Sequence, residues 1–222
     1  MPVLAISNTS IYLGYVIPAA TLIPIIAGLV CYKQLNKPLR ILLVYLIASL
    51  ILNTMGSVLA EYHLNNLPGL HFYTIVEVVT LMLYFLYAFE RGIISKWIKV
   101  VMCVFPVICI INFSFFQSIY EYNTYTRPLG AIIIIAFTTA YMVMQSNFKN
   151  AELVTSSGRV VAAGFMIYFC SSLFQFIFSN VVDNSASKTL LLVIWNLHGT
   201  FVLIMYLLIF RAIIYERNNR KY

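Results

Sequence analysis

The sequence predicts an all-α integral membrane protein whose seven transmembrane helices form one bundle. Three observations lead to this fold class. Of the 222 residues, 62% are hydrophobic and 9% are charged, whereas a soluble domain has about 25% charged residues. Seven apolar segments follow one another, and each is long enough to cross a bilayer as a helix. The basic residues gather in alternate links between these segments.

The first four predicted spans cover residues 11–31, 41–60, 71–90 and 97–117. Pro18 and Pro24 lie in the first span and Pro106 in the fourth; membrane helices tolerate proline, although each can kink the helix. The second span carries a polar residue at every fourth position. Steps of four stay on one broad face of a helix, so we expect this face and Pro106 to pack against protein. The face consists of Tyr45, Ser49, Asn53 and Ser57.

The remaining spans cover residues 128–144, 160–182 and 189–210, which completes a single transmembrane domain over residues 1–222. Pro128 opens the fifth span, where the first turn of a helix favours proline. The sixth span carries hydroxyl and amide side chains along one side. The seventh contains the sequence Trp-Asn-Leu-His from Trp195 to His198. No link between the spans is long enough for a soluble domain.

Basic residues set the expected orientation of the bundle. The even-numbered links hold only Arg127 and Lys188 of the 14 Lys and Arg residues. The other basic residues lie in the odd-numbered links and the C-terminal segment: Lys33, Lys37, Arg40, Arg91, Lys96, Lys99, Lys149, Arg159, Arg211, Arg217, Arg220 and Lys221. Because cytoplasmic loops carry the excess of Lys and Arg, we expect the N-terminus outside and the C-terminus in the cytoplasm. The net charge of +7 then requires no nucleic acid as a partner, and the expected partner is the lipid bilayer.

The third span contains an acidic residue well inside its apolar sequence. Glu77 lies about six residues from one end, roughly 9 Å at 1.5 Å per residue. A carboxylate at this depth is expected to face protein rather than lipid. Helical spacing puts it on one face with Tyr73, Thr80, Tyr84 and Tyr87. We therefore expect this helix at the centre of the bundle, with its polar face inward.

Other polar side chains are expected at a similar depth, in the outer half of the bundle. With Glu77 they form the set of candidates for binding a ligand or a proton: Glu77, His198, Asn53, Gln175, Asn196 and Tyr73. The role of Glu77 stays open between ligand contact, proton carrier, general acid or base, and structural hydrogen bonding. The amides are also typical of interhelical hydrogen bonds. No catalytic residue, metal site or cofactor is predicted.

The spans place no Lys or Arg at the depth of Glu77. Arg127 and Lys188 are expected at the outer mouths of the fifth and seventh spans, where long basic side chains reach toward water. A buried carboxyl group without a cation is expected to stay protonated. We therefore expect Glu77 to be a neutral acid that donates a hydrogen bond to Asn196 or His198.

Two features resemble a group of known proteins. Tyr73-x-x-x-Glu77 of the third span and Trp195-Asn-Leu-His198 of the seventh are similar to small uncharacterised seven-helix bacterial membrane proteins, some of which are sensor modules beside histidine kinases. The resemblance covers the whole chain in outline. It implies a sensory role and a multi-pass location in a bacterial inner membrane.

Three other seven-span families fit less well. A retinal protein needs a lysine in the middle of its seventh helix, and Lys188 lies at the mouth of that span. Sugar carriers of the PQ-loop type carry Pro-Gln pairs, which this sequence lacks. Lys37-Pro38-Leu39 is similar to the lysoplasmalogenase family, but that family relies on intramembrane aspartates and no aspartate lies in a predicted span.

The sequence therefore favours a membrane protein with a sensory or small-ligand-binding role. The expected ligand is a small molecule, a lipid or a proton, read by the polar residues of the outer half. Since no cytoplasmic domain is predicted, output would pass through a cytoplasmic or membrane signalling partner. The alternative is an intramembrane enzyme or a carrier of small molecules or protons that uses Glu77 and His198 as an acid–base pair.

Overall fold

A computed structural model describes residues 12–89, 92–147 and 156–219, and all regular structure in these ranges is helical. Within them, seven helical segments are long and apolar enough to cross a membrane. Their bounds are Tyr12–Val30, Lys37–Glu61, Leu67–Ala88, Ile93–Phe116, Thr126–Ser146, Ser157–Val182 and Thr189–Asn219. The prediction of an all-helical chain with seven apolar helices is confirmed. The seventh segment continues past residue 210, where the sequence suggested its end.

The first segment is broken by its prolines. It consists of a π-helical turn η1 (Tyr12–Val16), a short α2 (Ile17–Ala20) and α3 (Leu22–Val30). Pro24 has no N–H to donate to the carbonyl of Ala20, which removes a helical hydrogen bond. The helix therefore breaks at Thr21. Its N–H donates to the Pro18 carbonyl, three residues earlier, at 3.2 Å.

The second and third segments begin with local caps. After the 3₁₀ turn η2 (Tyr32–Gln34), α4 (Lys37–Glu61) starts at Asn36, whose Oδ1 accepts from the Leu39 N–H at 3.0 Å. Such a cap satisfies a donor that the first turn would otherwise leave unpaired. α5 (Leu67–Ala88) follows a short turn and carries a proline in its first turn, where the missing N–H costs nothing.

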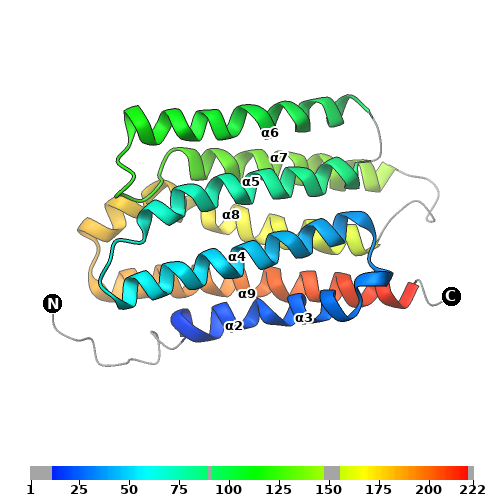
Figure 1. Ribbon diagram of the computed structural model, residues 1–222, viewed down its shortest axis with the longest axis horizontal. Coiled ribbons are helices and arrows are strands. Elements are labelled where there is room, and N and C mark those ends of the chain that lie inside the picture. Colours follow the sequence, from blue (N-terminus) through cyan, green and yellow to red (C-terminus); the bar gives the residue numbers. More distant parts are fainter. Residues whose placement is uncertain (1–11, 90–91, 148–155, 220–222) are drawn as a thin grey trace.

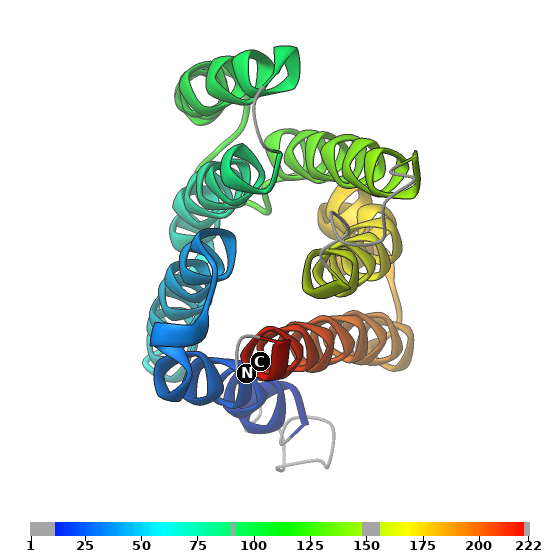
Figure 2. The ribbon, with the colours of Figure 1, turned by 90° about the vertical axis from the view of Figure 1, so that its right-hand side faces the viewer.

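Six segments surround a common interior and one lies outside. α6 (Ile93–Ile111) continues into the π-helical turn η3 (Asn112–Phe116), and α7 (Thr126–Asn147), α8 (Ser156–Ser185) and α9 (Lys188–Asn219) complete the chain. Packing contacts connect α3 to α4, α4 to α5, α5 to α7, α7 to α8, α8 to α9 and α9 back to α3. Figure 2 shows this ring, with α6 outside it against α5.

One end of the bundle holds the α4–α5 turn, the η3–α7 connection and the α8–α9 turn; we refer to it as the α4–α5 end (Figure 1). Its connections are linked by hydrogen bonds. Asn65 Nδ2 donates to the Tyr120 carbonyl at 3.3 Å, and the Tyr122 N–H donates to Asn180 Oδ1 at 3.1 Å. These bonds join the η3–α7 connection to the α4–α5 turn and to the last turns of α8, next to the site described below.

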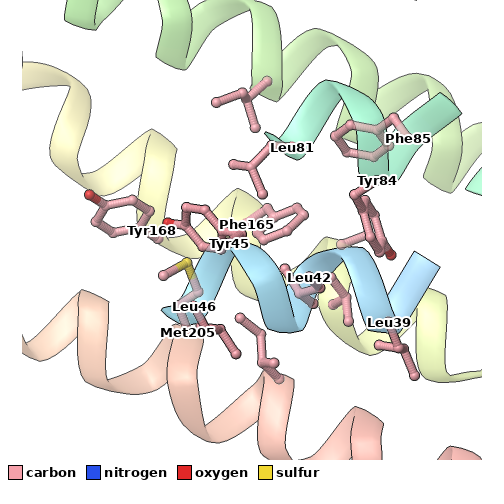
Figure 3. Close-up of a cluster of buried hydrophobic side chains, with 14 of the residues drawn as sticks. Leu39, Leu42, Tyr45, Leu46, Leu81, Tyr84, Phe85, Phe165, Tyr168 and Met205 are labelled. Carbon is pink, nitrogen blue, oxygen red and sulfur yellow. The ribbon is translucent and has the colours of Figure 1, made fainter. Parts of the chain in front are cut away.

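The core is a cluster of large apolar side chains to which α3 and α6–α9 contribute along with α4 and α5; Figure 3 shows the part formed by α4, α5, α8 and α9. Leu46, Leu81, Phe85 and Phe165 have no exposed surface. Tyr45 and Tyr168 lie in the same cluster and carry its first polar groups toward the α4–α5 end. The core therefore passes directly into the polar region.

The outward surface of the segments is also apolar. Side chains such as Ile51, Val104, Phe174 and Val193 are each about half exposed or more, at 61%, 48%, 60% and 56%. A soluble monomer rarely exposes apolar side chains so extensively. Seven apolar helices with this surface fit a multi-pass membrane protein.

Two predicted helix faces are only partly correct. On α5, Tyr73, Glu77 and Tyr84 are buried as predicted, but Tyr87 is 41% exposed, with the Lys37 ammonium 3.8 Å from the centre of its ring. Phe85 and Phe89, two residues before and after Tyr87, are buried, so Tyr87 lies on a different side of the helix from the packed face. On α4 the face was predicted to be buried along its length. Tyr45 and Ser49 confirm this, whereas Asn53 and Ser57 are exposed and Pro106 of α6 is half-buried.

Candidate functional site

The carboxyl group of Glu77 lies in the interior of the bundle, with 2% of the residue exposed. Two tyrosine hydroxyls donate to its Oε1: Tyr73 at 3.0 Å, from one turn earlier on α5, and Tyr45 at 3.1 Å, from α4. The Tyr73 hydroxyl also lies 3.3 Å from Ser49 Oγ. A buried carboxyl group needs such partners because water cannot solvate it. The predicted hydrogen bond from Glu77 to Asn196 or His198 is wrong, because Asn196 Oδ1 has no partner among the described residues and His198 bonds to Ser172.

A cation lies close to this group. The Arg127 side chain is 9% exposed, with Cζ 5.3 Å from the centre of the Tyr73 ring and 4.4 Å from that of Phe176. The guanidinium also interacts electrostatically with the Tyr168 side chain. Its charge acts on Glu77, and Tyr73 lies between the two, because its hydroxyl contacts the carboxyl group while its ring faces the guanidinium. The expectation that no cation lies near Glu77 is wrong.

The first turn of α7 explains why Arg127 points inward. Asn123 Oδ1 accepts from the backbone N–H groups of Thr126 and Arg127 at 3.0 and 3.2 Å, and from Thr126 Oγ1 at 2.8 Å. Its Nδ2 donates to Thr74 Oγ1 of α5 at 3.3 Å. The hydrogen bonds of Asn123 thus stabilise a first turn of α7 that begins at Thr126, two residues before Pro128. They also connect this turn to α5. Arg127 therefore belongs to the helix rather than to the link before it.

The guanidinium of Arg127 keeps one donor without a protein partner. Nη1 is buried and has no hydrogen-bond partner among the described residues. A buried donor left unpaired costs on the order of 1–3 kcal/mol, and more if the group is charged. Buried charges in a bundle of apolar helices mark functional sites by default. Nη1 is therefore a strong donor that the described interior leaves unpaired.

His198 lies on α9 across the interior from Arg127. Its Nδ1 is 2.8 Å from Ser172 Oγ of α8, and its ring packs against Tyr168, Phe176 and Trp195 with centroid distances of 5.6, 5.7 and 6.2 Å. Phe176 and Tyr168 thus contact both His198 and Arg127. The imidazole belongs to the same cluster as the guanidinium, although it makes no direct bond to Glu77.

A cavity of about 420 Å³ reaches this cluster from the α4–α5 end. Met55 and Ser57, which are exposed, line its mouth, and side chains of α2, α4, α5 and α9 form its walls. Its polar lining includes the half-buried His198 and the buried side chains of Tyr45, Tyr73, Arg127, Tyr168 and Tyr206. The cavity therefore connects an exposed surface with the buried tyrosines and Arg127.

The six candidate residues from the sequence fall into three groups. Tyr73 and His198 line the deep part of the cavity and Asn53 lies near its mouth. Glu77 sits behind Tyr73 and Tyr45 and does not itself line the cavity. Gln175 and Asn196 lie outside its lining, and each has a buried side-chain oxygen without a hydrogen-bond partner among the described residues.

Sequence reasoning missed three residues of the site: Tyr45 as a partner of Glu77, Tyr168, and above all Arg127. Pro128 suggested that the fifth span begins after Arg127. The available signal was the pair Asn123 and Thr126, since a capping asparagine before a helix start moves that start toward the N-terminus. Comparison with protein-family models, with curated proteins and with solved structures found no match, so no family assignment accompanies the fold.

Proposed function

We propose that this chain is a multi-pass membrane receptor that binds a small molecule in the cavity above Arg127. One observation carries the proposal: the cavity runs from an exposed mouth to a buried guanidinium, an imidazole and several tyrosines. Ligand sites have this form, with mostly apolar walls, a few convergent polar groups and a volume of roughly 300–1,000 Å³. The cavity, at about 420 Å³, lies within that range.

The proposal places the α4–α5 end outside the cell and the C-terminus in the cytoplasm. The support is the distribution of Lys and Arg, which favours the links at the opposite end. In this orientation the mouth of the cavity opens to the exterior, or in bacteria to the periplasm. The resemblance to bacterial sensor modules supports an inner-membrane location.

A signalling partner at the cytoplasmic end completes the proposal. α9 carries His198 at the cavity and continues to Asn219 at the opposite end. There, Ser157 Oγ of α8 donates to Glu216 Oε2 of α9 at 2.8 Å. Since α8 and α9 both contribute to the cavity and contact each other along their length, a shift of α9 on ligand binding would reach a partner protein at that end.

The structure favours binding over the two alternatives. An enzyme would need a reactive group that a substrate can reach. Ser172 and His198 have the spacing of a nucleophile and its base, but Ser172 is 1% exposed and is not part of the cavity lining. A carrier would need a passage beyond the cluster, where Leu46, Leu81 and Phe85 are packed without exposed surface.

Two measurements test this proposal. A reporter fused after Tyr222 is expected in the cytoplasm, and one inserted near Asn65 outside. For the cavity, Val202→Cys, which lines it, is compared with Val193→Cys, which lies nearer the α4–α5 end but faces outward. Both are made in a chain whose native cysteines are alanine: Cys31, Cys103, Cys109 and Cys170.

A charged, water-soluble methanethiosulfonate reagent is added to the protein in phosphatidylcholine vesicles. The cysteine at position 202 lies deeper along the helix but is expected to react, because water fills the cavity that it lines. The cysteine at position 193 lies nearer the end of the helix but is expected to stay protected, because it faces lipid. An unreactive position 202, or faster reaction at position 193, would contradict an aqueous cavity and with it the receptor proposal.

A further inference from the structure

We infer that the cavity binds a small monocarboxylate through Arg127, with the apolar body of the ligand along the cavity walls; this inference rests on the receptor function proposed above. The first step is the unpaired donor. Arg127 Nη1 is buried and has no hydrogen-bond partner in the described chain. A guanidinium presents a planar fork of N–H groups that matches the two oxygens of a carboxylate.

The described groups around the guanidinium do not supply a counter-charge that bonds to it. Tyr73 and Phe176 offer it ring faces and Tyr168 a hydroxyl, which stabilise a cation but do not neutralise it. Direct pairing with Glu77 would use up the donors, yet Glu77 accepts its hydrogen bonds from Tyr45 and Tyr73. The protein therefore holds a buried cation at the cavity wall without a carboxylate bonded to it in the described chain.

The third step gives the charge of the ligand. The polar lining contains one guanidinium, and the carboxyl group of Glu77 lies just behind Tyr73. A dianion would meet a single cation and a nearby carboxyl group, whereas a monoanion matches the guanidinium alone. His198 uses Nδ1 toward Ser172 and lines the cavity, so its Nε2 is available as a second polar contact for the ligand.

The fourth step gives the size and body of the ligand. A water molecule takes about 30 Å³ of liquid volume, so an inorganic monoanion would leave most of the 420 Å³ cavity unfilled. The walls include Ile17, Leu52, Val202 and Met205. An aliphatic or aromatic body attached to the carboxylate would exclude water there. Such a carboxylate could arrive from the aqueous side as a soluble acid or from the bilayer as a fatty acid.

The test uses protection of Val202→Cys from the thiol reagent at pH 7. Hexanoate is the soluble probe, hexanamide is its uncharged match, and palmitate in phosphatidylcholine vesicles represents the membrane source. Hexanoate is expected to slow labelling about tenfold at ten times its Kd, while hexanamide leaves the rate unchanged. Protection by palmitate but not by hexanoate would support the same chemistry with the bilayer as its source.

Variants connect the protection to Arg127. Arg127→Gln is expected to abolish protection, and Tyr168→Phe, which keeps the ring and removes the hydroxyl beside the guanidinium, to weaken it several-fold if Arg127→Gln does not fold. Arg159→Gln, an exposed arginine at the opposite end, is the matched control and keeps full protection.

The outcomes separate this inference from the receptor proposal. Equal protection by hexanoate and hexanamide, no protection by either carboxylate, or full protection in both Arg127→Gln and Tyr168→Phe would overturn the carboxylate site. In each case labelling of an unprotected position 202 would leave the aqueous cavity, and so the receptor proposal, standing.

Discussion

The interior of the bundle differs between its two halves. Toward the α4–α5 end, Tyr73 and Arg127 line a cavity, and the Glu77 carboxyl group lies behind Tyr73, whose hydroxyl donates to it. Toward the opposite end, rings fill the space: Phe85 packs against Phe165 and Tyr141, with centroids 6.1 and 6.3 Å apart. Both halves are built from the same helices. We therefore expect the second half of α5 to contribute mainly to stability and, under the receptor proposal, its first half to contribute to ligand binding.

Packing explains the aromatic half. Interiors of this kind are held by contacts between side chains, because lipid is as apolar as the core. Offset and edge-to-face ring pairs add about 0.5–1.5 kcal/mol each. The polar half contains the cavity and a buried donor without a partner among the described residues. We therefore expect substitutions in the aromatic half to change stability and those in the polar half to change binding.

The largest effect on stability is expected for Phe165→Ala. Phe165 has no exposed surface and contacts Tyr84, Phe85 and Phe169 through its ring. A residual void of roughly 100 Å³ at about 24 cal/mol per Å³ corresponds to about 2.4 kcal/mol of unfolding free energy. The measurement is denaturant unfolding in mixed micelles.

Phe174→Ala is the control for this substitution. Phe174 lies on the same helix but is 60% exposed, so its loss is expected to change the unfolding free energy by less than about 0.5 kcal/mol. Equal losses for Phe165→Ala and Phe174→Ala would mean that the aromatic half is not the stable half.

A smaller effect is expected for Tyr45→Phe, at the boundary of the two halves. The substitution keeps the ring in the core and removes the hydroxyl that donates to Glu77. Interhelical hydrogen bonds in membrane bundles contribute about 0.6 kcal/mol on average, and we expect a loss of that order in unfolding free energy.

Asn53→Leu is expected to be close to neutral. The sequence suggested that the Asn53 side chain faces protein and that this substitution would weaken folding. In the structure the residue is exposed, and Ser57 Oγ donates to its backbone carbonyl, which a leucine would keep. A loss larger than that of Tyr45→Phe would contradict the exposed position of Asn53.

Composition and helical spacing predicted seven apolar helices and the burial of Glu77, because both depend only on the order of apolar and polar residues along a single helix. They could not predict which helices meet. Tyr45 and Glu77 are 32 residues apart and come together only through the packing of α4 against α5. Arg127 is buried because Asn123 and Thr126 let α7 begin two residues before the predicted start at Pro128. The ends of helices are the least reliable part of a prediction from sequence.

The central claim is that Arg127 and Glu77 act on each other in one buried cluster, through Tyr73. A double-mutant cycle with Arg127→Gln and Glu77→Gln, read out as unfolding free energy in mixed micelles, tests it most directly. We predict a coupling of about 0.5 kcal/mol or more, with the double variant less destabilised than the sum of the single variants. Additivity within about 0.3 kcal/mol would show that Arg127 reaches toward water instead, as its place in the sequence first suggested, and would contradict the cluster.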